Sequence, residues 1–192
     1  MKPIAATPEL IVDELFALYE LHGNEDYIGE PVSQIEHMSQ AAALAESEGY
    51  DDEVVLAAFF HDLGHLCASE NAESMDGLGA VNHEKLGADY LRERGFSERL
   101  ANLVQAHVVA KRYLTFKHPE YYEKLSPASK GTLNFQGGVM SAAEAAAFEA
   151  NPDAHLIIRM RYWDDEAKLQ EIPVDNINRL KTKALDHLKG KK

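Results

Sequence analysis

The chain has 192 residues, of which 45% are hydrophobic and 27% are charged. This length and composition are typical of one globular domain with a core of its own, and they exclude an intrinsically disordered chain. The formal net charge of −13 argues against nucleic acid or an anionic membrane as a partner, because both would repel an acidic protein.

The targeting and redox signals predict a cytoplasmic protein. The longest purely apolar run, residues 54–60, is far shorter than the ~20 residues of a membrane-spanning helix. Residues 1–10 contain one lysine and two prolines and lack the apolar stretch of a signal peptide. The single cysteine, Cys67, excludes an internal disulfide and fits a reducing compartment.

Apolar residues recur with helical spacing along most of the chain, so we expect an all-α fold. Capping residues, prolines and glycines predict where each helix begins and ends. They indicate helices over residues 8–22, 31–48, 51–60, 83–94, 98–113, from 142 onward, 155–168 and 174–188. We expect residues 66–82 to be irregular because they have no stable period. We expect the same of residues 114–140, which contain Pro119, Pro127 and a pair of glycines.

No repeat, low-complexity tract or long linker divides the chain. We therefore expect a single helical domain over residues 1–192, with its core at about residues 8–188 and a short basic tail at residues 189–192.

Four of the nine histidines lie on the apolar face of a predicted helix. They are His37, His61, His83 and His107, and each is expected to point toward the core. One such histidine is more often an ordinary core residue than a ligand. Four on separate helices reverse this preference, because unpaired buried ring nitrogens cost about 1–3 kcal/mol each. A divalent or trivalent cation would satisfy them together.

Asp62 follows His61 directly, at the end of the apolar run. An unpaired carboxylate would be costly to bury there, whereas its two oxygens can bridge two metal ions. Four histidines and Asp62 exceed the ligands that one tetrahedral zinc needs, so we expect two metals. Asp164 is the expected sixth ligand because it shares a helical face with Ile157 and Met160. The alternative for Asp164 is a solvated acidic patch. Imidazole and carboxylate ligands suit iron, manganese or zinc.

The order of these ligands resembles a family signature. His37, the pair His61-Asp62 and a later aspartate resemble the HD-domain superfamily, whose best-known members are metal phosphohydrolases. His83 and His107 match the variant that holds two metals, so the chain resembles the HD-domain mixed-valent di-iron oxygenases. The phosphonate-degrading type, which cleaves a carbon–phosphorus bond, is more similar than inositol oxygenase. Its matching segments are residues 26–30, 61–65, 107–113, 125–129, 136–138 and 163–164.

The resemblance implies a helical HD-type bundle whose core holds two irons, as Fe(II) and Fe(III), with O2 as co-substrate. The implied ligands are His37, His61, Asp62 and Asp164 for one iron, and His83, His107 and the bridging Asp62 for the other.

The resemblance also implies how substrate would bind. Tyr27 would ligate the second iron until substrate arrives, and Glu30 would recognise an ammonium group of the substrate. The phosphonate pocket would consist of His65, Lys111, Ser129, Thr132 and Gln136.

The implied activity is O2-dependent cleavage of the carbon–phosphorus bond of 1-hydroxy-2-aminoethylphosphonate, with the amine free or trimethylated. The products would be phosphate and either glycine or glycine betaine. A separate hydroxylase would supply the substrate. The alternatives are an HD-type metal-dependent phosphohydrolase, which is the strongest of them, an inositol oxygenase, and a non-enzymatic sensor of metal or oxygen.

Overall fold

The computed structural model describes residues 6–27, 29–68 and 73–190. Residue 28 of the segment 26–30, residues 69–72 of the predicted irregular segment and residues 191–192 of the basic tail lie outside the described residues. The described residues form helices and two isolated β-bridges, and they contain no strand longer than a bridge. The helices are α1 (Pro8–His22), α2 (Gln34–Ser47), α3 (Asp52–Phe60), α4 (Leu63–Cys67), α5 (His83–Glu93), α6 (Glu98–Lys117), α7 (Pro119–Lys124), α8 (Pro127–Phe135), α9 (Ala142–Glu149), α10 (Ala154–Glu166) and α11 (Ile177–Leu188). The predicted all-α fold is confirmed.

Side-chain caps start several helices where the sequence predicts them. The capping residues accept a hydrogen bond from a backbone N–H of the first turn, which has no partner inside the helix. They are Thr7 for α1, Asp51 for α3, Ser97 for α6 and Ser141 for α9. The predicted start of the second helix at Pro31 is wrong. α2 begins at Gln34 because Ser33 forms a capping box with Glu36.

Both segments that the sequence predicts to be irregular are partly helical. α6 continues to Lys117, and α7 and α8 follow within residues 114–140. Pro119 and Pro127 occupy the first positions of α7 and α8, where proline is tolerated because its missing N–H would have no helical partner. α4 likewise extends to Cys67, into the segment 66–82.

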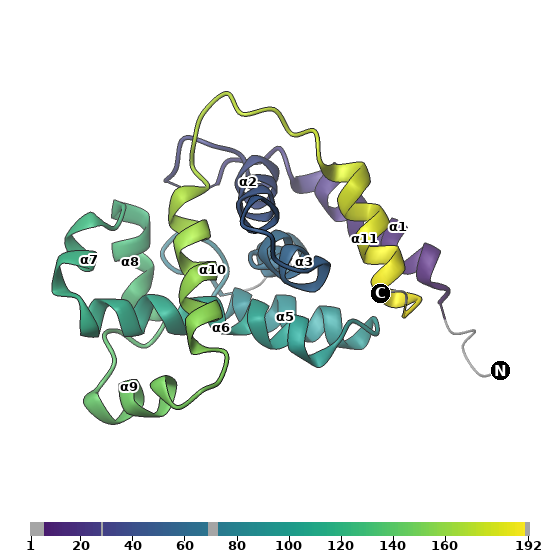
Figure 1. The fold of residues 1–192 in the computed structure, drawn as a ribbon. Coiled ribbons are helices and arrows are strands. Elements are labelled where there is room, and N and C mark those ends of the chain that lie inside the picture. The colour runs from purple at the N-terminus through teal and green to yellow at the C-terminus, as the bar shows by residue number, and fades with distance from the viewer. Residues whose placement is uncertain (1–5, 28, 69–72, 191–192) are drawn as a thin grey trace.

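α3 lies at the centre of the fold. Residues 54–60 are all buried, and α3 contacts α2, α6, α10 and α11. α10 packs against α6 and α2, and α11 lies beside α1, as Figure 1 shows. These contacts bring the inner faces of α2, α3, α5, α6 and α10 around one place in the core, where the predicted metal ligands lie.

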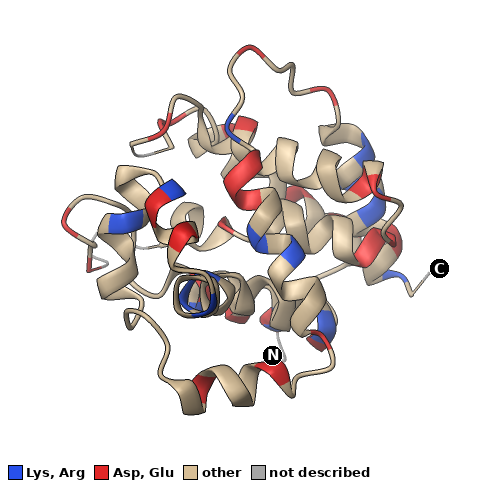
Figure 2. Cartoon of the chain, turned by 60° about the vertical axis from the view of Figure 1, so that its left-hand side comes forward, with Lys and Arg blue, Asp and Glu red and all other residues tan. Residues whose placement is uncertain are grey.

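Acidic positions are spread over several helices and loops, as Figure 2 shows, and are not gathered on a single element. None of the helices in the described residues combines the length and apolar character that crossing a membrane requires.

Candidate metal centre

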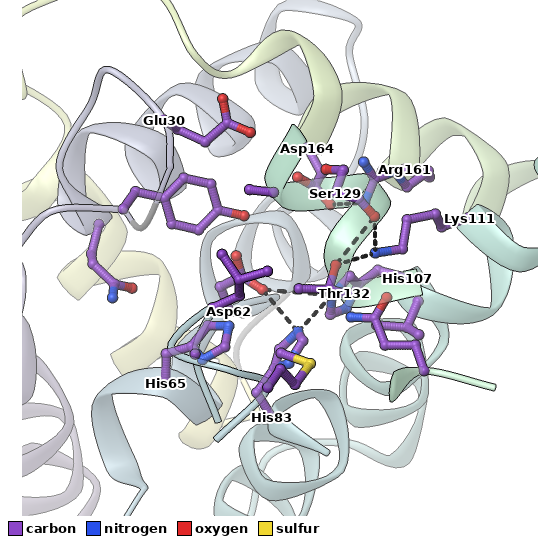
Figure 3. Close-up of a pocket in the computed structure, with 18 residues that line it drawn as sticks. Glu30, Asp62, His65, His83, His107, Lys111, Ser129, Thr132, Arg161 and Asp164 are labelled. Atoms are coloured by element: carbon purple, nitrogen blue, oxygen red, sulfur yellow. Dashed lines mark hydrogen bonds and ion pairs between the residues drawn. The ribbon is translucent and has the colours of Figure 1, made fainter. Parts of the chain in front are cut away.

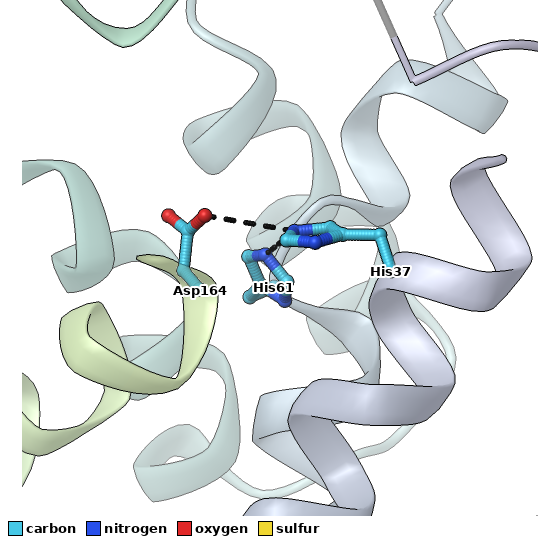
Figure 4. A group of neighbouring side chains, drawn as sticks. All are labelled: His37, His61 and Asp164. Atoms are coloured by element: carbon cyan, nitrogen blue, oxygen red, sulfur yellow. Dashed lines mark hydrogen bonds and ion pairs between the residues drawn. The ribbon is translucent and has the colours of Figure 1, made fainter. Parts of the chain in front are cut away.

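Six buried side chains form two adjacent groups that could each hold a metal ion. His37, His61 and Asp164 form the first group, and Asp62, His83 and His107 form the second; in each, the candidate ligand atoms lie within 4.8 Å of one another. Figure 4 shows the first group, with both imidazoles directed toward Asp164. Asp164 is only 4% exposed, so the solvated-patch alternative for this residue is wrong.

Asp62 joins the two groups through its two carboxylate oxygens. Oδ2 lies 3.6 Å from His37 Nε2 and 3.3 Å from His61 Nε2. Oδ1 lies 3.3 Å from His83 Nε2 and 3.5 Å from His107 Nε2. Each oxygen therefore faces a different pair of imidazoles, as a carboxylate that bridges two metal ions would.

Backbone carbonyl groups orient three of the four imidazole rings. In each ring Nδ1–H can donate to a carbonyl oxygen, which leaves Nε2 with its lone pair toward the centre. The pairs are His37 with Ala167 at 2.9 Å, His61 with Ala58 at 2.8 Å and His107 with Val104 at 2.7 Å. His83 differs, because its Nδ1 has no hydrogen-bond partner within the described part of the chain, and the Glu84 carboxylate lies 3.7 Å away.

The donor set fits two cations. His37 Nε2 lies 3.0 Å from His61 Nε2, and His83 Nε2 lies 3.3 Å from His107 Nε2. Two ring nitrogens at these distances need a shared proton or a cation between them. Asp62 Oδ2 is also buried and lacks a hydrogen-bond partner among the described residues. Bound cations would satisfy all these groups at once, and imidazole with carboxylate suits iron, manganese or zinc.

Burial and charge leave most of these groups ready to bind metal. Burial lowers the pKa of His37 to about 4 and that of His107 to about 3, so both rings are neutral near pH 7. Burial also opposes the charge of His61, but the Asp62 carboxylate outweighs it and raises the His61 pKa to about 9. A metal must therefore displace a proton from His61. In turn, His61 holds the pKa of the Asp62 carboxyl group well below its usual value, against the effect of burial.

A pocket opens onto the second group, as Figure 3 shows. Its wall includes Asp62, His83, His107 and Asp164. The structure also brings to this pocket all the residues that the resemblance implies for substrate: Tyr27, Glu30, His65, Lys111, Ser129, Thr132 and Gln136. These come from the loop before α2 and from α4, α6, α8 and the end of α8.

Lys111 places a buried amine in the pocket. It is 2% exposed, so it is not a surface lysine. Its Nζ donates to Thr132 Oγ1 at 2.8 Å and to the Ser129 carbonyl oxygen at 3.4 Å. Burial, followed by the nearby Arg161 guanidinium, lowers the pKa of Lys111 to about 7. An anion in the pocket would favour its protonated form.

His65 reaches the pocket from a separate short helix. α3 ends at Phe60 and α4 begins at Leu63, so α3 does not continue to His65. The His65 ring stacks on His83 with the ring centroids 4.0 Å apart. Its Nδ1 accepts from Ala80 N–H at 3.2 Å, and burial lowers its pKa to about 3. The neutral ring therefore carries its proton on Nε2 and can donate it.

Tyr27 and Glu30 lie on the loop between α1 and α2. The Tyr27 ring stacks on His37, with the ring centroids 4.0 Å apart, and burial raises the pKa of its hydroxyl well above the usual value. Glu30 Oε1 accepts a hydrogen bond from Lys168 Nζ at 2.8 Å. No pattern in the sequence predicts this ion pair.

Arg161 also lines the pocket, and the sequence pattern assigns it no role. It is 3% exposed and donates from Nη1 to Asp164 Oδ2 at 2.6 Å. It also pairs with Asp165. Against the effect of burial, the Arg161 charge lowers the pKa of Asp164 and so keeps that carboxylate ionised. Its position one helical turn before Asp164 is the sequence signal that could have identified it.

The sequence profile of the HD domain matches residues 35–131, which include the four histidines and Asp62. The chain belongs to the HD-domain family. This confirms the predicted resemblance and the HD-type helical architecture.

Three relatives within this family cover most of the chain. An uncharacterized protein of Acanthamoeba polyphaga mimivirus is 46% identical over 82% of this chain and 73% of its own length. A protein of Leisingera caerulea, named [1-hydroxy-2-(trimethylamino)ethyl]phosphonate dioxygenase (glycine-betaine-forming), is 42% identical over 82% of this chain and 80% of its own. A hydroxymethylphosphonate dioxygenase of Gimesia maris is 37% identical over 93% of this chain and 89% of its own. The chain therefore belongs to the same family as two phosphonate dioxygenases.

Proposed function

We propose that this protein is an O2-dependent oxygenase that cleaves the carbon–phosphorus bond of a 1-hydroxyalkylphosphonate. The substrate type is 1-hydroxy-2-aminoethylphosphonate, with the amine free or trimethylated, and the products are phosphate and glycine or glycine betaine. The observation that carries the proposal is Asp62, whose two oxygens face two histidine pairs beside a pocket with a buried lysine. The names of two relatives support the same chemistry.

The reaction balances without an external reductant. One hydroxyalkylphosphonate and one O2 give one carboxylic acid and one phosphate. The carbon that carries the hydroxyl group loses its bonds to hydrogen and phosphorus and becomes the carboxyl carbon. The two oxygen atoms of O2 are divided between the two products, and the substrate supplies all four electrons that reduce O2.

Two irons would supply the one-electron redox chemistry that O2 requires, as an Fe(II)/Fe(III) pair. The first would be held by His37, His61, Asp62 and Asp164, and the second by His83, His107 and Asp62. Burial and the negative charge of the nearby Asp62 carboxylate raise the pKa of the Tyr27 hydroxyl, and Tyr27 lines the same pocket as Asp62 and His83. We assign Tyr27 the role of a ligand that substrate displaces from the second iron.

The phosphonate end of the substrate would bind where the pocket offers positive charge and donors. Lys111 is a buried amine whose protonated form an anion would favour, and His65 offers Nε2–H. Ser129 and Thr132 hold the Lys111 amine. The Gln136 side chain lines the same pocket, and its Oε1 has no hydrogen-bond partner in the described residues. These groups orient the substrate so that its hydroxyl-bearing carbon faces the metal ligands.

The amine end of the substrate would lie toward Glu30. A carboxylate there accepts hydrogen bonds from a free ammonium group and attracts a trimethylated one by charge alone. The Tyr27 ring beside it offers an aromatic face to either cation. We further propose that the protein acts in the cytoplasm on a small molecule, and that a separate hydroxylase supplies this substrate.

Measurement of O2 uptake and phosphate release by the iron-loaded protein tests this function. With 1-hydroxy-2-aminoethylphosphonate, its trimethyl analogue or hydroxymethylphosphonate, we expect one O2 consumed per phosphate released, and no release without O2. Hydrolysis of phosphate esters under anaerobic conditions, with no phosphonate consumed in air, would instead establish an HD phosphohydrolase.

A further inference from the structure

Glu30 already holds an ammonium group in this structure. Lys168 Nζ lies 2.8 Å from Glu30 Oε1, and the two side chains are 14% and 8% exposed. The same Nζ lies 5.8 Å from the centroid of the Tyr27 ring. Lys168 therefore occupies the position, between a carboxylate and an aromatic face, that the ammonium group of a substrate would need.

The pair joins two segments that are far apart in the sequence. Glu30 and Tyr27 are held in one turn, in which Glu30 N–H donates to the Tyr27 carbonyl oxygen at 2.9 Å. Lys168 comes two residues after the end of α10. The turn and the end of α10 thus meet at the edge of the pocket that Glu30 lines.

Hydrogen bonds anchor the backbone on both sides of Lys168. On one side, the Ala167 carbonyl oxygen lies 2.9 Å from His37 Nδ1. On the other, Leu169 N–H donates to Gln40 Oε1 at 3.1 Å, and Gln40 Nε2 donates back to the Leu169 carbonyl oxygen at 3.0 Å. The Lys168 side chain also lines an outer groove together with Asp165 and Tyr121. The groove offers a displaced ammonium group a place near another carboxylate.

We propose that Lys168 determines specificity at the amine end of the substrate, by competing with the substrate's cationic group for Glu30. While the ion pair is intact, its charges cancel, and a second cation must displace Lys168 before Glu30 can attract it. A hydroxyalkylphosphonate without a cationic group meets no such competition. Lys168 therefore shifts the preference of the protein toward uncharged substituents. This inference rests on the proposed function.

The competition also ranks the two cationic substrates. A free ammonium group can replace the hydrogen bond that Lys168 donates to Glu30. A trimethylammonium group has no N–H and cannot replace it. We therefore expect Lys168 to weaken binding of the trimethylated substrate more than binding of the free amine.

Isothermal titration of the iron-loaded protein without O2 measures binding in the absence of turnover. The ligands are hydroxymethylphosphonate and 1-hydroxy-2-aminoethylphosphonate, and the variants are Lys168→Met and Lys168→Arg. We expect Lys168→Met to change the ratio of the two dissociation constants by roughly tenfold in favour of the amine. Lys168→Arg keeps the charge and should leave the ratio near that of the wild type.

A double-mutant cycle shows whether the effect passes through Glu30. In a Glu30→Gln background, Lys168→Met should favour the amine ligand much less than in the wild type, because no carboxylate remains to attract the amine and only the repulsion by Lys168 is removed. Lys117→Met is the matched control, since Lys117 pairs with Glu149 at 2.9 Å at an exposed position away from the pocket.

The outcomes separate this inference from the proposed function. If neither phosphonate binds the wild type, the proposed function is wrong and the inference falls with it. If both bind and Lys168→Met changes the ratio by less than about twofold, where the competition predicts roughly tenfold, the role of Lys168 is wrong. That role is also wrong if the shift is equally large in the Glu30→Gln background.

Discussion

Asp62 differs from the other candidate ligands because it is shared between two groups. Its Oδ1 faces His83 and His107, and its Oδ2 faces His37 and His61. Asp164 belongs to the first group alone. Loss of Asp62 should therefore affect two metal positions, and loss of Asp164 only one.

Metal content per chain tests this difference. After iron loading and removal of free metal, Asp62→Asn should lose most of both irons, whereas Asp164→Asn should keep the one held by His83 and His107. Circular dichroism reports whether each variant keeps its helices. If both variants lose only one iron per chain, and the same one, Asp62 does not bridge two metal positions.

The buried amine of Lys111 links stability to pH. Its pKa is about 7 in the folded protein and about 10.4 in an unfolded chain. Between these values the unfolded chain binds more protons, so this residue's contribution to the free energy of unfolding rises with pH. The slope approaches about 1.4 kcal/mol per pH unit.

Lys111→Met removes this contribution. Denaturant unfolding at pH 7, 8 and 9 measures the free energy of unfolding of both proteins. The stability of the variant relative to the wild type should be greatest at pH 7 and should fall as the pH rises. The variant should also bind phosphonates at least about tenfold more weakly, because the cation is lost. A stability difference that does not change with pH would contradict a buried, neutralised Lys111.

The residue types and spacings of the metal ligands could be predicted from the sequence, because His37, His83 and His107 lie in α2, α5 and α6 and His61 directly follows the apolar helix α3. Lys168 could not be predicted as a partner of Glu30. Nothing local relates two residues separated by most of the chain, and only the packing of α10 against α2 brings them together. His65 is expected in the pocket from the family resemblance alone, because helical spacing does not predict the break between α3 and α4 that precedes it.

At the scale of the helices, a close contact between α4 and α5 positions His83. A Cβ atom added at Gly64 would lie 1.8 Å from the His83 carbonyl oxygen, so a side chain there would force α5 away from the metal centre. Gly64→Ala should destabilise the protein by about 3 kcal/mol, the upper end for overpacking. It should also lower the binding of the metal held by His83.

Gly131→Ala is the control for this helical glycine. A Cβ atom there meets only Leu78 Cδ1, at 2.6 Å, which is the end of a flexible side chain. We expect the free energy of unfolding of the Gly131→Ala variant to stay within about 1 kcal/mol of the wild-type value, since alanine also favours the helix. Equal effects of the two substitutions, measured by denaturant unfolding, would contradict the role given to Gly64.

The helix starts that could be predicted are those with local caps, such as Ser97 and Ser141, because the cap and its partner lie within one turn. The sequence does not predict α7 and α8, because Pro119 and Pro127 interrupt helical interiors but can also begin helices. Choosing between these two roles depends on where the preceding segment ends, which the tertiary packing of α6 decides.

For the whole molecule, one apolar core connects residues from α1 to α11. We propose that residues 8–188 form a single domain, with a short basic tail at residues 189–192. The metal centre lies inside this core, so bound metal should stabilise the entire fold.

Removal of metal by a chelator should lower the melting temperature. A ligand present at a hundredfold excess over its dissociation constant adds about 2.7 kcal/mol to the free energy of unfolding. For a domain of this size, that raises the melting temperature by roughly 5–10 °C. Differential scanning calorimetry of loaded and chelated protein measures the change. Equal melting temperatures would contradict a metal centre inside the core.

Electron paramagnetic resonance of the iron-loaded, partly reduced protein tests the central claim most directly. If Asp62 bridges two irons, the wild type should give the signal of a spin-coupled Fe(II)/Fe(III) pair. That signal should change when a hydroxyalkylphosphonate is added, and it should be absent from Asp62→Asn. A wild-type spectrum that contains only isolated ferric ions at every degree of reduction would contradict a metal pair bridged by Asp62.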